Sequence, residues 1–175
     1  MKLDSQAVGA FGERTVEAEL LRRGWIPANV NATVKNAADF DIYALKRGRT
    51  DRSVLLRVKT CGPDVREFQF GGFAPGKPVK IEKFSDSDFT ILVSMADKRD
   101  HDEFYVVPSR LVRKEVALRQ RDWMRVSKRD GGKRKDVGLW VLRLRERRDG
   151  HREAGYGLQK KWAKYLGAWS LLEHD

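Results

Sequence analysis

Apolar residues recur at strand-like intervals in two short stretches of the first half of the chain, residues 38–45 and 53–60. Each stretch consists largely of apolar residues and carries charged residues inside the apolar run. Such runs predict short buried strands. The segment between them, residues 47–52, is polar and has the length of a connection within a hairpin. We therefore predict that the two strands pair with each other.

Charged residues occupy one face of each predicted strand. Because side chains alternate between the two faces of a strand, Arg57 and Lys59 share a face, and so do Asp39 and Asp41. If the strands pair, Asp41 meets the row formed by Arg57 and Lys59. Charges on half-buried strands need a partner or a chemical task. A structural ion pair from Asp41 to Arg57 or Lys59 explains the pattern as well as a functional site does.

Helical spacing predicts a helix over residues 5–23, with Ser5 as N-cap and Gly24 as its end. Glu13 falls on the stripe that faces the sheet, where a carboxylate needs a hydrogen-bond donor, a cation or a metal. A rotated helix would instead leave Glu13 at an edge in water. The stripe consists of Gly9, Glu13, Val16 and Leu20, and its glycine is expected to let the helix backbone approach its neighbour closely.

The rest of the chain predicts further strands and two more helices. The expected strands are 25–34 (interrupted by Pro27), 66–70, 88–95, 103–107 and 139–144, with a Gly/Pro-rich loop at 71–78. One helix begins at Pro108. The last helix carries an apolar seam of Leu158, Trp162, Tyr165, Trp169 and Leu172. This order predicts a mixed α/β (α+β) fold of four to five mixed strands flanked by helices, in a single domain over residues 1–175.

The charge of the chain is concentrated in its second half. The formal net charge is +11, and residues 110–152 hold 16 Lys or Arg against six Asp or Glu. Such density favours a nucleic-acid partner, although a solvated basic surface is the simpler alternative. The interleaved Trp123, Trp140 and Trp162 are expected in the core rather than as base-stacking platforms. The candidate contacts to nucleic acid are Arg125, Lys128, Arg129, Lys133, Arg134 and Lys135.

The single cysteine, Cys61, excludes an internal disulfide and fits a reducing compartment. No apolar run reaches the length of a membrane span, and the chain shows no secretory segment at its start. We therefore expect a cytoplasmic protein with no membrane partner, and we expect Cys61 to have no catalytic role.

Taken together, the ordered segments resemble the PD-(D/E)XK (restriction-endonuclease-like) nuclease superfamily, and in particular its small intron-encoded and phage-defence members. The resemblance rests on a helix that carries a Glu, an acidic strand and a strand that ends in x-Lys. These are GAFGERTVEAELLRRGW, ADFDIYAL and LLRVKT in this chain, followed by REFQF, DSDFTILVSM, EFYVVPSRLV and KKWAKYLGAWSLLE. It spans most of the chain from Gly9 onward.

The resemblance implies a restriction-endonuclease-like core and metal-dependent cleavage of phosphodiester bonds, in DNA more than in RNA. It implies Mg²⁺ or Mn²⁺ held by Asp41, with Glu13 binding through water or orienting the helix, and the Val58 carbonyl as a further ligand. Lys59 would position the attacking water or stabilise the developing negative charge. Cleavage of both strands of a duplex would suit a homodimer.

Arg57 departs from the pattern of that superfamily, which has an acid or Gln at this position. A guanidinium group has only donors and cannot bind a metal. Three interpretations follow. The site survives on Glu13, Asp39 and Asp41, with Arg57 directed at DNA phosphate. A neighbouring acid, Asp64 or Glu67, replaces the missing one. Alternatively, Arg57 pairs with Asp41 or Glu13, and the chain is an inactive nucleic-acid-binding module.

Overall fold

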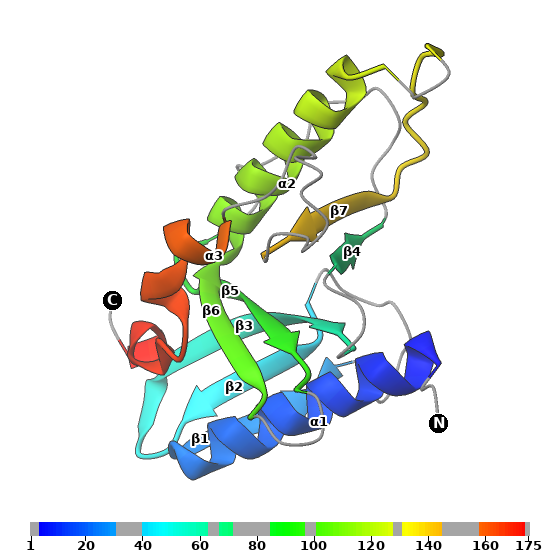
Figure 1. Cartoon of the computed structure of the whole chain (residues 1–175). Coiled ribbons are helices and arrows are strands. Elements are labelled where there is room, and N and C mark those ends of the chain that lie inside the picture. Colours follow the sequence, from blue (N-terminus) through cyan, green and yellow to red (C-terminus); the bar gives the residue numbers. More distant parts are fainter. Residues whose placement is uncertain are drawn as a thin grey trace.

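The computed structural model describes residues 4–30, 40–62, 67–71, 85–96, 101–127, 131–144 and 158–173. Its helices are α1 (Ser5–Arg22), α2 (Ser109–Arg125) and α3 (Leu158–Lys161), with two 3₁₀ helices, η2 (Ala163–Tyr165) and η3 (Trp169–Glu173). Its strands are β1 (Trp25–Asn29), β2 (Ile42–Lys46), β3 (Arg49–Cys61), β4 (Glu67–Phe70), β5 (Asp88–Ser94), β6 (Glu103–Pro108) and β7 (Trp140–Arg143). The expected mixed α/β class is confirmed (Figure 1).

A five-stranded mixed sheet, in the order β1-β2-β3-β5-β6, forms the centre of the molecule. β1, β2 and β3 pair antiparallel, β3 and β5 pair parallel, and β5 and β6 pair antiparallel. The predicted pairing of the two charged strands is confirmed, with Tyr43 opposite Leu55. The turn between them is shorter than predicted. Gly48 adopts a positive φ of 78°, which closes a tight turn and lets β3 begin at Arg49.

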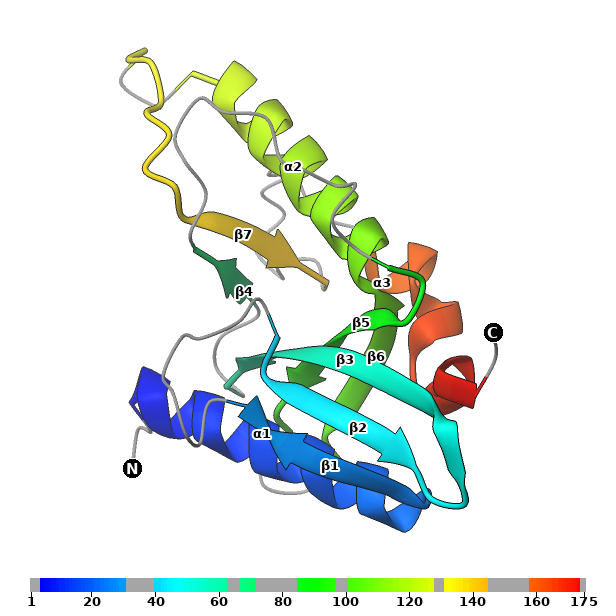
Figure 2. The same ribbon diagram turned by 180° about the vertical axis from the view of Figure 1, so that it is seen from behind.

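The two faces of this sheet bury separate cores. On the α1 face, Val54, Leu56 and Val58 of β3 pack with Val16 and Leu20 of α1. The opposite face, here called the α2 face, packs against α2, α3 and a two-stranded sheet of β4 and β7. Views from the front and from behind show α1 covering one face of the five-stranded sheet, while α2, β4 and β7 form a lobe that projects from it (Figures 1 and 2).

Helix α1 differs from its prediction at two positions. The N-cap is Asp4 rather than Ser5, because the Asp4 carboxylate accepts from the Ala7 N–H at 2.7 Å. The glycine that allows close packing is Gly12 rather than Gly9. A Cβ atom at Gly12 would lie 1.7 Å from Oγ1 of Thr60, whereas a Cβ at Gly9 would meet nothing within 4 Å. The backbone of α1 therefore packs directly on β3.

The C-terminal seam is buried as predicted, but it does not lie on one continuous helix. It is divided among α3, η2 and η3, and Gly167 between them has a positive φ of 62°. The Gly167 N–H donates to the Phe104 carbonyl at 2.8 Å, and Leu166 bridges to Tyr105 of β6. The segment bends because it follows the edge of β6 and provides hydrogen-bond partners for main-chain groups of that edge strand.

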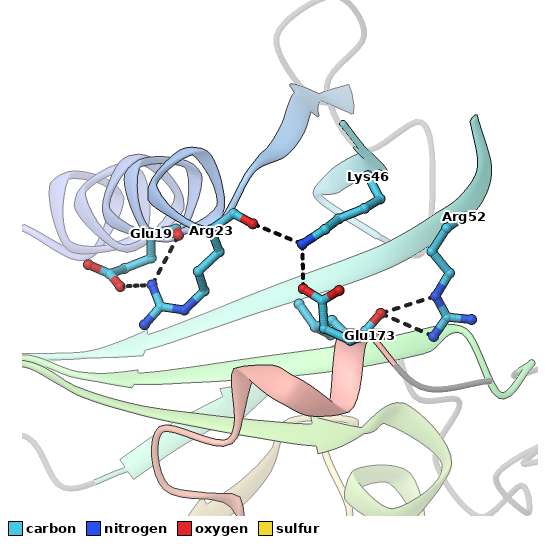
Figure 3. A network of polar contacts seen from close by, with 6 residues as sticks. Glu19, Arg23, Lys46, Arg52 and Glu173 are labelled. Carbon is cyan, nitrogen blue, oxygen red and sulfur yellow. Dashed lines mark hydrogen bonds and ion pairs between the residues drawn. The ribbon is translucent and has the colours of Figure 1, made fainter. Parts of the chain in front are cut away.

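Polar contacts fix the end of this segment to the β2–β3 hairpin and to α1 (Figure 3). Arg52 donates from Nε and Nη2 to the Leu172 carbonyl at 3.1 and 3.0 Å. Lys46 donates to the Arg23 carbonyl at 2.9 Å and to the Glu173 carboxylate. These contacts close the end of the sheet at which the β2–β3 turn lies. No helix in the described residues is both long and apolar enough to cross a membrane.

Candidate functional site

Asp41 lies directly before β2, and three of its hydrogen bonds join it to described residues. Its main-chain N–H donates to the Leu56 carbonyl of β3 at 2.8 Å, and its carbonyl accepts from the Val30 N–H at 2.9 Å. Its carboxylate Oδ2 accepts from the Val58 N–H at 2.7 Å. Asp41 is therefore fixed where the ends of β1 and β2 meet the middle of β3.

The Val58 carbonyl lies on the same edge of β3 as the Asp41 carboxylate. The N–H and C=O of one residue point to the same side of a strand, and the Val58 N–H points to Asp41. The β2–β3 register ends at the pair Ile42 and Leu56, two residues before Val58. The Asp41 carboxylate thus accepts the hydrogen bond that the Val58 N–H would otherwise donate to a main-chain carbonyl of β2. The carbonyl predicted to bind a metal lies where β2 no longer covers β3.

Glu13 of α1 reaches the sheet, as predicted. Its carboxylate Oε2 accepts from Nδ2 of Asn29, the last residue of β1, at 2.9 Å, and the side chain is half-buried. The Val30 N–H that bonds to Asp41 follows Asn29 in the chain. The end of β1 therefore contacts both residues, through the Glu13 carboxylate and the main-chain carbonyl of Asp41. No sequence signal marked Asn29, because an amide at the end of a strand is common in turns.

Lys59 lies on the α2 face of β3, with Nζ 5.9 Å from the ring centroid of Phe70. Burial lowers the pKa of the Lys59 ammonium, and the charges of Arg57 and Arg113 lower it further, while those of Asp41 and Glu13 oppose the shift. All four charges therefore lie close enough to Lys59 to act on it. The joint site of Asp41, Glu13 and Lys59 stays a prediction.

Arg113 is the member of this charged group that sequence reasoning missed. It lies on α2, in a different predicted element from the strands, and its spacing alone does not distinguish it from the other basic residues of that helix. Its contribution to the pKa of Lys59 reports its proximity. Only the docking of α2 over the sheet brings Arg113 to Lys59.

The structure describes only some of the acids considered for the site around position 57. Glu67 of β4 pairs with Arg143, its register partner on β7, so it stabilises the small sheet. Asp39 and Asp64 lie outside the described residues. The Asp41 and Glu13 carboxylates accept from the neutral donors of Val58 and Asn29. The contact expected of Arg57 with one of these two acids stays a prediction.

The donors at this site are hard oxygen ligands of the kind that Mg²⁺ and Mn²⁺ bind. Two carboxylates and a main-chain carbonyl are present, and Mg²⁺ usually takes one or two carboxylates and retains several waters. Beside Glu13, Oδ1 of Asn29 and Oγ1 of Thr60 are buried without a hydrogen-bond partner among the described residues. Among all the residues that the structure describes, no group of three His, Cys, Asp or Glu side chains is arranged to hold a metal ion. Two carboxylates match the number that such an ion usually takes, so these donors fit it.

Two segments that carry predicted nucleic-acid contacts, the end of α2 and residues 131–139, lie at the far end of the projecting lobe, whereas Arg57 lies on β3 (Figure 1). Arg125, Lys133 and Lys135 are exposed. The Arg134 guanidinium lies 4.5 Å from the ring centroid of Trp123, so this Trp packs against a cation rather than in the core. Trp140 and Trp162 are buried, as expected. Lys128 and Arg129 lie outside the described residues.

Cys61 is buried in the core on the α2 face. Its side chain packs among the apolar residues of that core, and the histidines in the described part of the chain are limited to the exposed His101. The expectation that the thiol has no catalytic role stays a prediction.

No protein-family model matches the chain, and no curated protein sequence matches it. Among solved structures, the chain is similar to that of a bacterial homing endonuclease, I-Ssp6803I. The similarity covers 98% of this chain and 92% of that chain, with 13% sequence identity and a TM-score of 0.47. Similarity at this level assigns no family, so the function proposed next rests on the residues of this chain.

Proposed function

We propose that this protein is a metal-dependent DNA endonuclease with a restriction-endonuclease-like core. The observation that supports the proposal is the position of the Asp41 carboxylate, which accepts from the Val58 N–H one residue before Lys59 on β3, while Glu13 accepts from Asn29 at the adjoining end of β1. Rigid placement of the groups that bind the reacting centre is what catalysis requires. The order of helix, paired strands, strand and helix is also the one that the resemblance to PD-(D/E)XK nucleases implies.

Each residue has a role that its surroundings support. Asp41 and Glu13, with the Val58 carbonyl, would hold Mg²⁺ or Mn²⁺, which when bound polarises the phosphate and lowers the pKa of a coordinated water. Val58 and Asn29 orient the two carboxylates through hydrogen bonds. Lys59 would position the attacking water or stabilise the negative charge that develops on the phosphate. The exposed basic residues of the lobe, Arg125, Lys133 and Lys135, would bind the DNA backbone.

A second candidate function is favoured by the charges around Lys59. Among the described residues, Arg57 and Arg113 add positive charge around Lys59, and Asp41 and Glu13 add negative charge. Excess positive charge opposes metal binding and favours phosphate. On this reading, the chain is an inactive nucleic-acid-binding module with the same fold. A homodimer, which would present two sites to the two strands of a duplex, remains a prediction under the first proposal.

Plasmid cleavage in Mg²⁺ or Mn²⁺ separates the two functions. We expect nicking or linearisation by the native protein and loss of cleavage in Asp41→Asn, which keeps the size of the side chain but removes its charge. The matched control is Asp51→Asn on β3, because Asp51 is exposed and lies near the turn of the hairpin. Intact plasmid with every metal tried would refute the endonuclease. Binding of the same DNA in EDTA would then support the inactive module.

A further inference from the structure

Residues 133–139 lead from the far end of the lobe into β7, and the exposure of their side chains alternates along the chain (Figure 1). Arg134 and Asp136 are half-buried, and Gly138 is buried. The residues between them are exposed, and they are Lys133, Lys135, Val137 and Leu139. One set therefore faces the lobe and the other faces solvent. The exposed set, here called the outer face, combines two cations with two aliphatic side chains.

Contacts of the inward residues fix this segment to α2. Oδ1 of Asp136 accepts from Nε2 of Gln120 on α2 at 3.3 Å and from Nε1 of Trp140 at 2.9 Å. The Arg134 guanidinium lies 4.5 Å from the ring centroid of Trp123, also on α2. The segment is thus attached to the helix at two points. These attachments limit its rotation, so the outer face keeps its direction.

The aliphatic half of the outer face is unusually exposed. Val137 is 74% exposed, the largest fraction for any large apolar side chain in the described part of the chain, and Leu139 is 46% exposed. Among the described residues seven large apolar side chains are exposed, and three of them (Val126, Val137 and Leu139) lie on the lobe or directly after α2. Each forgoes about 25 cal/mol for every Å² that a partner could bury. Exposed apolar groups gathered in one region are typical of a binding surface.

The two lysines decide which kind of partner fits the outer face. Lys133 and Lys135 are exposed and carry positive charge, which attracts a polyanion. Lysine is depleted from the buried centres of protein–protein interfaces, so the mixture of lysines and aliphatic groups fits a protein partner poorly. DNA offers phosphates for the lysines and, in its major groove, the C5-methyl group of thymine for the aliphatic side chains. DNA therefore complements both halves of the outer face.

The order of residues along the segment suits a groove. The lysines come first and the aliphatic residues follow, each two residues from the next. Two residues of chain span at most about 7 Å, so Val137 lies within that distance of Lys135. The major groove is about 12 Å wide. Lysines on the phosphates at the edge of this groove thus leave the aliphatic side chains within reach of the base edges inside it.

We propose that the outer face enters the major groove of DNA. Lys133 and Lys135 contact phosphates, and Val137 and Leu139 pack against thymine methyl groups. This inference rests on the proposed function for DNA as the partner, but it does not require cleavage. It gives the protein a means of preferring sequences that contain thymine, and it adds two apolar residues to a surface that the sequence marked only by its charge.

Replacement of thymine by uracil tests the contact, because uracil differs from thymine only in lacking the C5-methyl group. Affinities for two duplexes of equal length, one of alternating dA and dT and one of alternating dA and dU, are measured in EDTA by fluorescence anisotropy. We expect the native protein to bind the thymine duplex more tightly, by about fourfold for each methyl group that becomes buried.

Variants of the exposed residues assign this preference to the outer face. Val137→Ala and Leu139→Ala should each lose part of the preference, and the double variant should bind the two duplexes within about twofold. Ile26→Ala is the matched control, because Ile26 is 55% exposed on β1, outside the lobe. It should keep the full preference. Lys133→Gln should weaken binding to both duplexes equally, because their phosphates are the same.

Two outcomes would overturn the proposal: equal affinity of the native protein for the two duplexes, or a thymine preference that persists in the double variant. The measurements also separate the inference from the proposed cleavage. A thymine preference that is lost in the double variant, together with an intact plasmid, would support the groove contact and reject the endonuclease. Plasmid cleavage without any thymine preference would do the reverse, and absence of binding to either duplex would overturn both.

Discussion

Lys59 shows at the scale of one residue how a charged group can oppose folding. Its ammonium is half-buried, and Arg57 and Arg113 repel it. Both effects lower its pKa, so protonated Lys59 is less stable in the folded chain than in the unfolded one. A residue that destabilises the fold and still occupies a central strand is typical of a functional site.

Lys59→Met should abolish cleavage and stabilise the fold by about 0.5–1.5 kcal/mol at pH 7, measured by urea unfolding. The unfolded chain binds more protons between the lowered pKa of Lys59 and its ordinary value of 10.5. Native stability attributable to Lys59 therefore rises with pH across this window, and the advantage of Lys59→Met should disappear above it. An advantage that stays constant through pH 10.5 would contradict the assignment to the Lys59 charge.

Gly12 sets the distance between α1 and β3, and hence the position of Glu13. Gly12→Ala should destabilise the fold by about 1–3 kcal/mol, because the new Cβ overlaps the Thr60 hydroxyl. Gly9→Ala is the matched control on the same helix, since its Cβ would meet open space. Thermal unfolding of both variants, and of Gly12→Ala with Thr60→Ala, checks this. The second change should restore part of the loss, and a fully native Gly12→Ala would exclude the close contact.

At the scale of an element, the C-terminal segment acts as a cover for the end of the five-stranded sheet. Trp169 of η3 is 6% exposed. It packs on Phe104 with ring centroids 5.6 Å apart, and the Arg23 guanidinium lies 4.7 Å from its ring centroid. The segment therefore joins β6 to the end of α1, and it closes the core on the α1 face.

Trp169→Ala should cost about 3–5 kcal/mol of unfolding free energy, the usual loss for a large buried aromatic. Leu166→Ala serves as the control in the same segment, because Leu166 is 46% exposed. It should change the stability by less than about 0.5 kcal/mol. Chemical denaturation of both variants measures the difference, and similar small losses would show that the segment does not close the core.

At the scale of the whole molecule, charge is divided between two regions. The candidate site lies where β2 begins beneath the lobe of α2, β4 and β7, and the exposed basic residues lie at the far end of that lobe (Figure 1). Under the proposed function, a duplex that meets the lobe would be bound by its phosphates at both regions. The net charge of +11 would then favour association through long-range attraction.

DNA affinity should therefore fall steeply with salt. Lys133→Gln and Lys135→Gln should each reduce the slope of log K against log[salt] by about 0.9 if each lysine contacts one phosphate. Lys160→Gln on α3 is the control, because it is equally exposed but lies away from the tip of the lobe. Anisotropy titrations at several salt concentrations provide the slopes. Equal slopes for all three variants would leave the lobe without its proposed partner.

The sequence by itself determined most of the elements and the first half of the candidate site. Period-two alternation in 38–45 and 53–60 identified the paired strands, and with them the approach of Asp41 to the strand of Arg57 and Lys59. Local sequence is sufficient to predict such features, because turn residues and the periodicities of strands and helices occur within short runs of consecutive residues. The sequence also predicted that Glu13 faces the sheet, and the hydrogen bond from Asn29 of β1 to the Glu13 carboxylate confirms this.

Only the tertiary structure decided which distant residues complete the site. Asn29 meets Glu13 because β1 ends beneath α1, and Arg113 approaches Lys59 because Ser109 is tied to Thr90. The close contact of Gly12 with Thr60 likewise helps to set the rotation of α1. The C-terminal seam bends because main-chain groups at the edge of β6 form hydrogen bonds with it. These are properties of packing between elements, which no periodicity within one element encodes.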